Sequence, residues 1–215
     1  MRSATPCYDT RIVRLTGIAL LLAGVQAGMP PAAETMVRRL EERQRAMTDM
    51  TARFVQTYRS GVLGREIVES GTLSLKPPGR MRFEYREPEP KLFVADGEEF
   101  FFYVPADRQV VVGSQREARG VAVRLLSGSA GILEEFDARI EEGGARLVLS
   151  PRSADPEVDR VWVELDAAGR IRGIEVVDAQ ANRSQYRFEE IRENVGLRDG
   201  LFEFRVPEGV EVVQG

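Results

Sequence analysis

The 215-residue sequence contains no histidine, and its single cysteine is Cys7. No disulfide can therefore form within the chain, and the body of the protein cannot build a zinc site from histidine and cysteine. Ser127 and Ser129 have no histidine that could activate them as nucleophiles. We therefore expect no enzymatic activity, no catalytic residue, no metal site and no cofactor.

Long apolar runs are also lacking, because the most apolar stretch, residues 15–24, falls short of the roughly 20 residues that span a bilayer. Arg11 and Arg14 precede it, and small residues follow up to Ala27. This order is typical of a secretory signal. We predict a cleaved signal peptide over residues 1–27, with Ala33 as a second cleavage position, and a single periplasmic domain over residues 28–215.

An excess of positive charge is missing as well, since 30 basic residues face 34 acidic ones and the formal net charge is −4. Such a surface does not attract nucleic acid, so we expect no nucleic-acid partner. Hydrophobic residues make up 43% of the chain, which is enough for one domain with a substantial core.

Residues 34–51 show the clearest helical pattern, with Val37, Leu40, Met47 and Met50 on one side. The apolar stripe needs an apolar partner, and the strands of residues 71–112 are the one candidate of sufficient size. Residues 115–136 predict two shorter helices, joined by a Gly- and Ser-rich link at residues 127–131.

Residues 71–112 predict an antiparallel meander with one oily face, because apolar and polar residues alternate between turns at 77–79, 87–90 and 96–97. A two-residue loop at Asp96-Gly97 would place Phe93 opposite Phe100 and Ala95 opposite Glu98. Phe93, Phe100 and Phe102 would then share a face, whereas the sequence leaves the direction of Phe101 and Tyr103 open.

Further strands are predicted at residues 138–140, 145–150, 160–165, 171–177 and 183–188, and the alternation of residues 201–212 closes the chain. Trp162 alternates with Val161 and Val163, so we expect it on the outer side or at a strand end. Short turns between many strands predict a mainly β fold with helices, built around one large curled antiparallel sheet.

The segments LSLKPPGRMRFEY and ADGEEFFFYVP resemble the LolA-like family, the periplasmic carriers of outer-membrane lipoproteins. MTDMTARFVQTY, RLLSGSAGILEEF and FEFRVPEGVEV resemble further segments of that family in the same order. The resemblance covers essentially the whole chain after residue 27.

The resemblance implies an unclosed antiparallel half β-barrel whose hydrophobic concave face, covered by lid helices, holds the acyl chains of lipoproteins. It implies a monomer that receives its cargo from an ATP-driven inner-membrane lipoprotein-releasing transporter and passes it to an outer-membrane lipoprotein receptor. The residues that would contact lipid are Leu40, Met47, Phe54, Leu73, Leu75, Met81, Phe83, Tyr85, Phe93, Phe100, Phe102, Leu125 and Phe136.

The sequence departs from the family at the first turn of the meander, where the family often carries an arginine that is thought to hold the lid closed. Pro77 stands at that position, and Lys76 precedes it. Lys76 is the nearby cation that could substitute for the arginine, although an ammonium lacks the planar guanidinium fork. Two other functions remain open: a carrier of another lipid or glycolipid in a dedicated export pathway, and a lipoprotein-sensing module.

Overall fold

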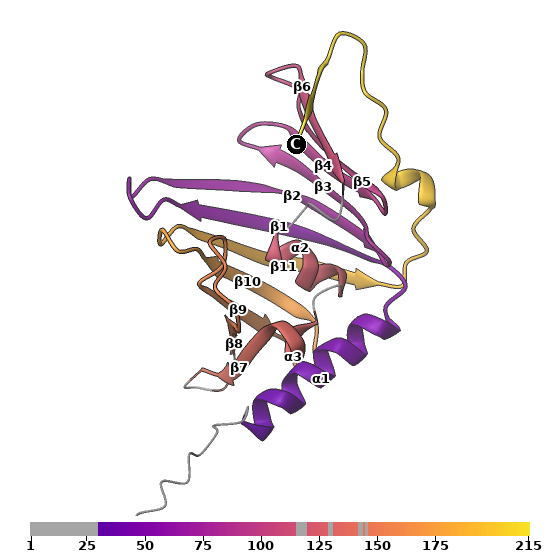
Figure 1. Ribbon diagram of the computed structural model, residues 1–215. Helices are drawn as coiled ribbons and strands as arrows, with labels where there is room; N and C mark the ends of the chain where they lie inside the picture. Colours follow the sequence, from indigo (N-terminus) through magenta and orange to yellow (C-terminus); the bar gives the residue numbers. More distant parts are fainter. Residues whose placement is uncertain (1–29, 115–119, 129–130, 142–143, 145) are drawn as a thin grey trace, which may run out of the picture.

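A computed structural model describes residues 30–114, 120–128, 131–141, 144 and 146–215 (Figure 1). The predicted signal peptide lies outside these residues. The helices are α1 (Pro31–Ala46), α2 (Val121–Ser127), α3 (Ile132–Glu135) and the 3-10 helix η1 (Asp199–Phe202). The strands are β1 (Met50–Arg59), β2 (Glu66–Lys76), β3 (Arg80–Glu87), β4 (Lys91–Asp96), β5 (Glu99–Val104), β6 (Gln109–Ser114), β7 (Phe136–Ile140), β8 (Arg146–Pro151), β9 (Arg160–Leu165), β10 (Ile171–Val177), β11 (Arg183–Glu193) and β12 (Glu211–Gln214).

All strands of the described residues belong to one curled sheet in the order β12-β6-β5-β4-β3-β2-β1-β11-β10-β9-β8-β7. Neighbouring strands are antiparallel, except that β12 runs parallel to β6. Within the described part of the chain, the end strands β7 and β12 do not pair with each other, so the sheet remains open. The helices lie inside its curve (Figure 1). The predicted unclosed half-barrel is confirmed.

Helix α1 is shorter than the sequence pattern predicted, because it ends at Ala46 and not at Thr51. Met47 already has an extended backbone, and β1 begins at Met50. Met47 and Met50 are buried as expected, but they reach the core from the connection and from the first strand. The apolar pattern of the sequence continues past the end of α1 because the helix and the start of β1 both bury their apolar side chains in the same core.

The partner of α1 also differs from the prediction. The helix packs against β7 and α3, at the opposite end of the sheet from the meander. The two short helices predicted within residues 115–136 are confirmed as α2 and α3, whereas residues 115–119 and 129–130, which include part of the predicted link, lie outside the described residues. Helix α2 packs on β10. The helical cover therefore rests mainly on strands that follow the helices in the sequence.

The hairpin between β4 and β5 has a different register from the one predicted. Phe93 pairs with Phe102, and Ala95 pairs with Phe100. The Asp96 carboxylate accepts the backbone N–H groups of Glu98 and Glu99, at 2.8 and 2.9 Å, which moves the turn one residue along the chain. Partners are displaced by two positions, so the predicted face of Phe93, Phe100 and Phe102 is retained.

The C-terminal segment is not the continuous strand that its alternation suggested. Residues 203–210 leave η1 without joining the sheet, and only residues from Glu211 onward form β12. The Phe204 ring instead packs on the outer face of β5, with centroids 5.4 Å from Phe101 and 5.7 Å from Tyr103. Phe101 and Tyr103 therefore point away from the concave face, and a second small core forms outside the sheet.

Asp49 joins the start of β1 to the segment that follows β11. Its buried carboxylate accepts the backbone N–H groups of Val195, Gly196 and Leu197 at 2.6–2.9 Å. The Asn194 side chain in turn accepts the backbone N–H of Thr48 at 2.8 Å. A buried carboxylate with three donors is well satisfied, so this junction fixes how the exit of α1 meets residues 194–210, which we call the outer segment.

Replacing Asp49 with alanine should lower the free energy of unfolding by about 3 kcal/mol, because three buried amides lose their charged acceptor. Urea unfolding of the purified protein measures the change. The matched control, Asp137→Ala, removes an exposed carboxylate paired with Arg152 and should cost less than about 0.5 kcal/mol. Equal stabilities of the two variants would show that the Asp49 junction is dispensable.

Candidate functional site

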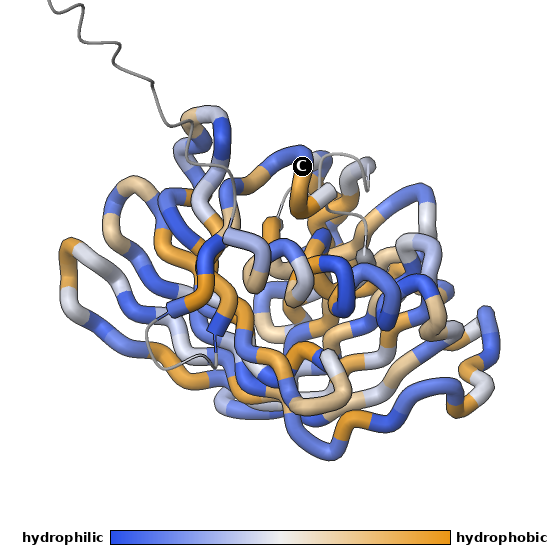
Figure 2. The backbone as a smooth tube through the Cα atoms, turned by 90° about the horizontal axis from the view of Figure 1, so that it is seen from below, coloured by the Kyte–Doolittle hydropathy of each residue, from blue (hydrophilic) through white to orange (hydrophobic). Residues whose placement is uncertain are grey.

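The concave face of the sheet collects the apolar side chains of every other residue along the strands. Figure 2 shows hydrophobic and hydrophilic residues interspersed along the backbone, as expected for strands whose successive side chains point to different faces. The pairings Leu73 with Phe83 and Phe83 with Phe93 carry this face across β2, β3 and β4. The candidate site is therefore a continuous surface rather than a cluster of polar groups.

The structure brings the predicted lipid-contacting residues to this surface. Most lie in strands, Leu40 and Leu125 face it from α1 and α2, and Met47 lies in the connection between α1 and β1. Phe102 pairs with Phe93 but lies outside the main apolar cluster. The members that belong to the cluster or pack against it are Leu40, Met47, Phe54, Leu73, Leu75, Met81, Phe83, Tyr85, Phe93, Phe100, Leu125 and Phe136.

Aromatic rings form a connected group at the centre of the face. The Phe54 ring meets Phe83 and Tyr85 edge-on, at centroid distances of 5.1 and 5.0 Å. Glycine is required at position 71, because a Cβ there would lie 1.9 Å from the Glu84 carbonyl oxygen and 3.0 Å from the Phe54 ring. Gly71 thus allows strands and rings to approach closely.

Coverage of the face is uneven. Leu40 of α1 and Leu125 of α2 are buried where the helices face the sheet, whereas Phe93 and Phe100, towards the β6 end of the sheet, are only partly buried. A pocket between α1, α2 and β10, lined by Leu40, Leu126 and others, has a cavity volume of about 30 Å³. That is room for a water molecule, not for a larger ligand. A larger ligand must displace the helices or enter from the β6 side.

Two side chains near the end of α1 hold the helix in place. The Arg43 guanidinium donates to the Glu193 carboxylate of β11, and the Gln44 side-chain amide donates to the Leu125 carbonyl of α2. The carboxylate is largely buried, while Arg43 is partly exposed. Sequence reasoning missed these contacts, because nothing in the local pattern indicates which distant residue an arginine will meet.

Lys76 does not act on the lid helices in this structure. Its ammonium donates to the Leu197 carbonyl at 2.7 Å and to the Asp199 carboxylate at 2.6 Å, both in the outer segment. Arg80 also pairs with Asp199, at 3.0 Å. The suggested substitution of Lys76 for the missing family arginine is therefore wrong for this closed arrangement, and the cation anchors the opposite side of the sheet.

Polar side chains border the aromatic group. The Tyr85 hydroxyl donates to the Gln56 side-chain oxygen at 2.8 Å, and Lys91 donates to Glu69 at 2.5 Å. Burial, followed by the charge of Glu69, raises the pKa of Tyr186 to about 12. Burial is also the main cause that raises the pKa of Tyr85, so both phenols stay protonated at neutral pH.

The outer face carries a different chemistry. Trp162 donates its indole N–H to Glu141 at 3.2 Å, and the guanidinium groups of Arg146, Arg160 and Arg183 lie within about 6 Å of its ring. Its predicted outward position is confirmed. Among the described residues, no acidic group of three or more could hold a metal ion, and no helix is long and apolar enough to cross a membrane.

Replacing Glu193 with glutamine should loosen α1, because a partly buried ion pair contributes about 1 kcal/mol. We expect about a fivefold gain in affinity for an uncharged apolar dye such as 1-N-phenylnaphthylamine, measured by fluorescence titration. The control Arg38→Met breaks an exposed pair within the same helix, that with Glu34. Unchanged dye affinity in the Glu193 variant would argue against a latch.

Alkaline pH should destabilise the protein through the two buried phenols. The raised pKa values favour the folded state below the ordinary tyrosine pKa of 10.0, and this contribution is lost as pH rises towards about 12. Urea unfolding at pH 9 and pH 11 should show the loss, and Tyr186→Phe should reduce it. Tyrosinate absorbance in which every tyrosine of the folded protein titrates with a midpoint near pH 10 would contradict the burial.

Comparison with known proteins gives relatives of matching length. An outer-membrane lipoprotein carrier protein of Azotobacter vinelandii is 30% identical over 209 residues, covering 95% of this chain and 98% of that protein. One of Alkalilimnicola ehrlichii is 34% identical over 172 residues, covering 78% of each chain.

The fold and the family follow from two further comparisons. The crystal structure of an uncharacterized conserved protein from Thermus thermophilus matches with a TM-score of 0.54 and 16% identity, over 86% of this chain and 99% of that one, so the fold is shared. The family described as outer membrane lipoprotein carrier protein LolA matches residues 45–205. The chain therefore belongs to the LolA family of outer-membrane lipoprotein carrier proteins.

Proposed function

We propose that this protein is a periplasmic carrier that binds the acyl chains of lipoproteins on its concave face and shuttles them from the inner to the outer membrane. The observation that carries the proposal is the continuous apolar face beneath helices that are attached by few polar contacts. Family membership supports the same cargo. The residues that we propose to contact lipid are the thirteen given above as lining or facing this surface.

Hydrophobic burial supplies the binding energy. Each CH₂ group removed from water contributes about 0.8 kcal/mol, so an acyl chain with about ten buried groups gains about 8 kcal/mol. Against this gain stands the exposure of residues that the helices now cover, such as Leu40 and Leu125. Binding and release are then an exchange of one apolar cover for another, which no nucleotide on the carrier has to drive.

The exchange requires partners on both sides. We propose that an ATP-driven transporter in the inner membrane loads the carrier and that a receptor in the outer membrane unloads it. Residues 1–27 would direct export as a cleaved signal peptide. The carrier would act as a monomer, since the cargo occupies a surface within a single chain.

A carrier of another lipid or glycolipid is the second candidate function. The observation that favours it is Pro77, which stands where the family often has the lid-holding arginine, while Lys76 contacts the outer segment. Helices that are held less tightly over the concave face would be compatible with a different lipid cargo. A lipoprotein-sensing module is the third reading left by the sequence, and a chain that binds lipoprotein without releasing it would favour that reading.

Native mass spectrometry of the purified mature protein with a synthetic diacylated lipopeptide tests the proposal. We expect a one-to-one complex, and at least a tenfold loss of affinity in Phe93→Glu, because a charge on the apolar face would have to be desolvated. Val62→Glu is the matched control, since Val62 is 83% exposed at the β1–β2 turn. Circular dichroism checks that both variants fold.

The outcomes separate the candidate functions. Loss of the complex in Phe93→Glu but not in Val62→Glu supports a lipoprotein carrier. Binding of phospholipid or glycolipid without lipopeptide favours the second function. A folded wild-type protein that binds none of these probes contradicts the carrier function altogether.

A further inference from the structure

The concave face changes character towards the end of the sheet that holds the β1–β2, β3–β4 and β5–β6 turns. Gln56 of β1 pairs with Tyr186 of β11 on one side and with Glu69 of β2 on the other. Lys91, the first residue of β4, pairs with Tyr85 of β3. These five residues form a row across five neighbouring strands, which we call the polar row.

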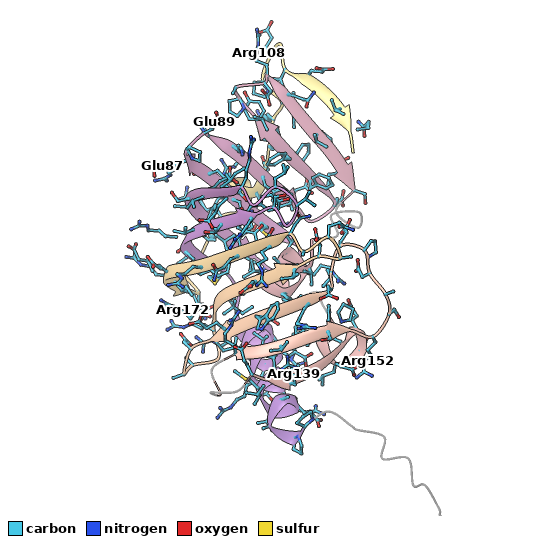
Figure 3. All side chains as sticks on the ribbon, turned by 90° about the vertical axis from the view of Figure 1, so that its left-hand side faces the viewer. Glu87, Glu89, Arg108, Arg139, Arg152 and Arg172 are labelled. Carbon is cyan, nitrogen blue, oxygen red and sulfur yellow. The ribbon has the colours of Figure 1, made fainter. Side chains whose placement is uncertain are left out.

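The polar row is internally bonded yet only partly covered. Lys91 and Glu69 form an ion pair at 2.5 Å with side-chain exposures of 27% and 13%, and Tyr85 bonds Gln56 at 2.8 Å. Beyond the row, Glu87 at the end of β3 and Glu89 in the β3–β4 turn are exposed charged residues (Figure 3). The row thus lies between the apolar interior and the aqueous rim.

The row directly adjoins the aromatic group that would receive acyl chains. The Tyr85 ring lies 5.0 Å from Phe54, and the Tyr186 ring lies 6.4 Å from Phe83 and 6.3 Å from Phe188. An acyl chain that packs on these rings would therefore place the polar group to which it is attached next to the polar row. The acyl chain itself has no hydrogen-bonding group that could interact with the row.

Stability does not explain the ion pair. Removing two charges from water costs as much as a partly buried pair regains, and apolar residues of similar volume are often at least as stable. Within the described residues, the bond to Glu69 is the one hydrogen bond that Lys91 donates, although an ammonium has three donors. The carboxylate and the ammonium both keep capacity for a ligand.

We propose that the polar row binds the ester and amide groups that join the acyl chains to the N-terminal cysteine of a lipoprotein. Carbonyl oxygens would accept hydrogen bonds from Lys91, and a backbone amide N–H would donate to Glu69. The pair has no net charge, so it suits a neutral dipolar group better than a phosphate, which the carboxylate would repel. This inference rests on the proposed carrier function and assigns its headgroup selectivity.

The test uses the full mature protein and two probes, a diacylated cysteinyl lipopeptide and the uncharged dye 1-N-phenylnaphthylamine. The double variant Glu69→Leu/Lys91→Met removes the pair without leaving an unpaired charge. We expect its lipopeptide affinity to fall about tenfold, as for lost bonds to charged groups, with dye affinity unchanged. The control, Arg53→Met/Glu190→Leu, removes the exposed outer pair and should change neither affinity.

Each result supports or overturns the assignment. The swapped pair Glu69→Lys/Lys91→Glu should recover part of the lipopeptide affinity, because donors and acceptors are both restored. Equal losses for lipopeptide and dye would mean that the pair only shapes the face, and undiminished lipopeptide binding would refute the polar row. Tighter binding of anionic phospholipid vesicles than of lipopeptide would also overturn it. A wild-type protein that binds neither probe would instead contradict the carrier function itself.

Discussion

The open, curled sheet has an apolar concave face that must be kept from water, and the rest of the structure depends on how this is done. Leu73 and Leu75 of β2 are fully buried there, in one apolar cluster with Leu40 of α1 and Leu125 of α2. Helices α1 and α2 are attached to the sheet by side-chain contacts and not by the backbone hydrogen bonds that join strands. A cover of this kind can be replaced by another apolar cover, which is the physical requirement for reversible binding of an acyl chain.

The two faces of the sheet are covered in different ways. On the outer face of β3 to β5, the segment after β11 is anchored by Lys76, Arg82 and the Phe204 ring, and it continues into β12 of the same sheet. On the concave face, α1 is held by Arg43 and Gln44. The outer core therefore supports the meander through contacts that do not involve the inner cover.

The concave face also varies along its length, from aliphatic side chains beneath the helices, through the aromatic group, to the polar row. This order matches the order of chemical groups in an acylated peptide, from hydrocarbon to ester and amide. An apolar surface alone binds any lipid, whereas polar groups at a fixed distance from it select one orientation and one kind of head. Selectivity in a carrier of this design would therefore be decided at the rim and affinity in the interior.

The sequence by itself determined which side chains within one strand share a face, because successive side chains of a strand alternate between the two faces. Phe93 and Phe100 lie in different strands, and they share the concave face as predicted because the observed register differs from the predicted one by two positions, an even number. Only the tertiary structure decided the end of α1, the outer position of residues 203–206, the pairing of Arg43 with Glu193 150 positions away, and the polar row. These features join segments that are distant in the sequence. A local sequence pattern indicates whether a side chain is buried, but it does not indicate which distant residue that side chain contacts.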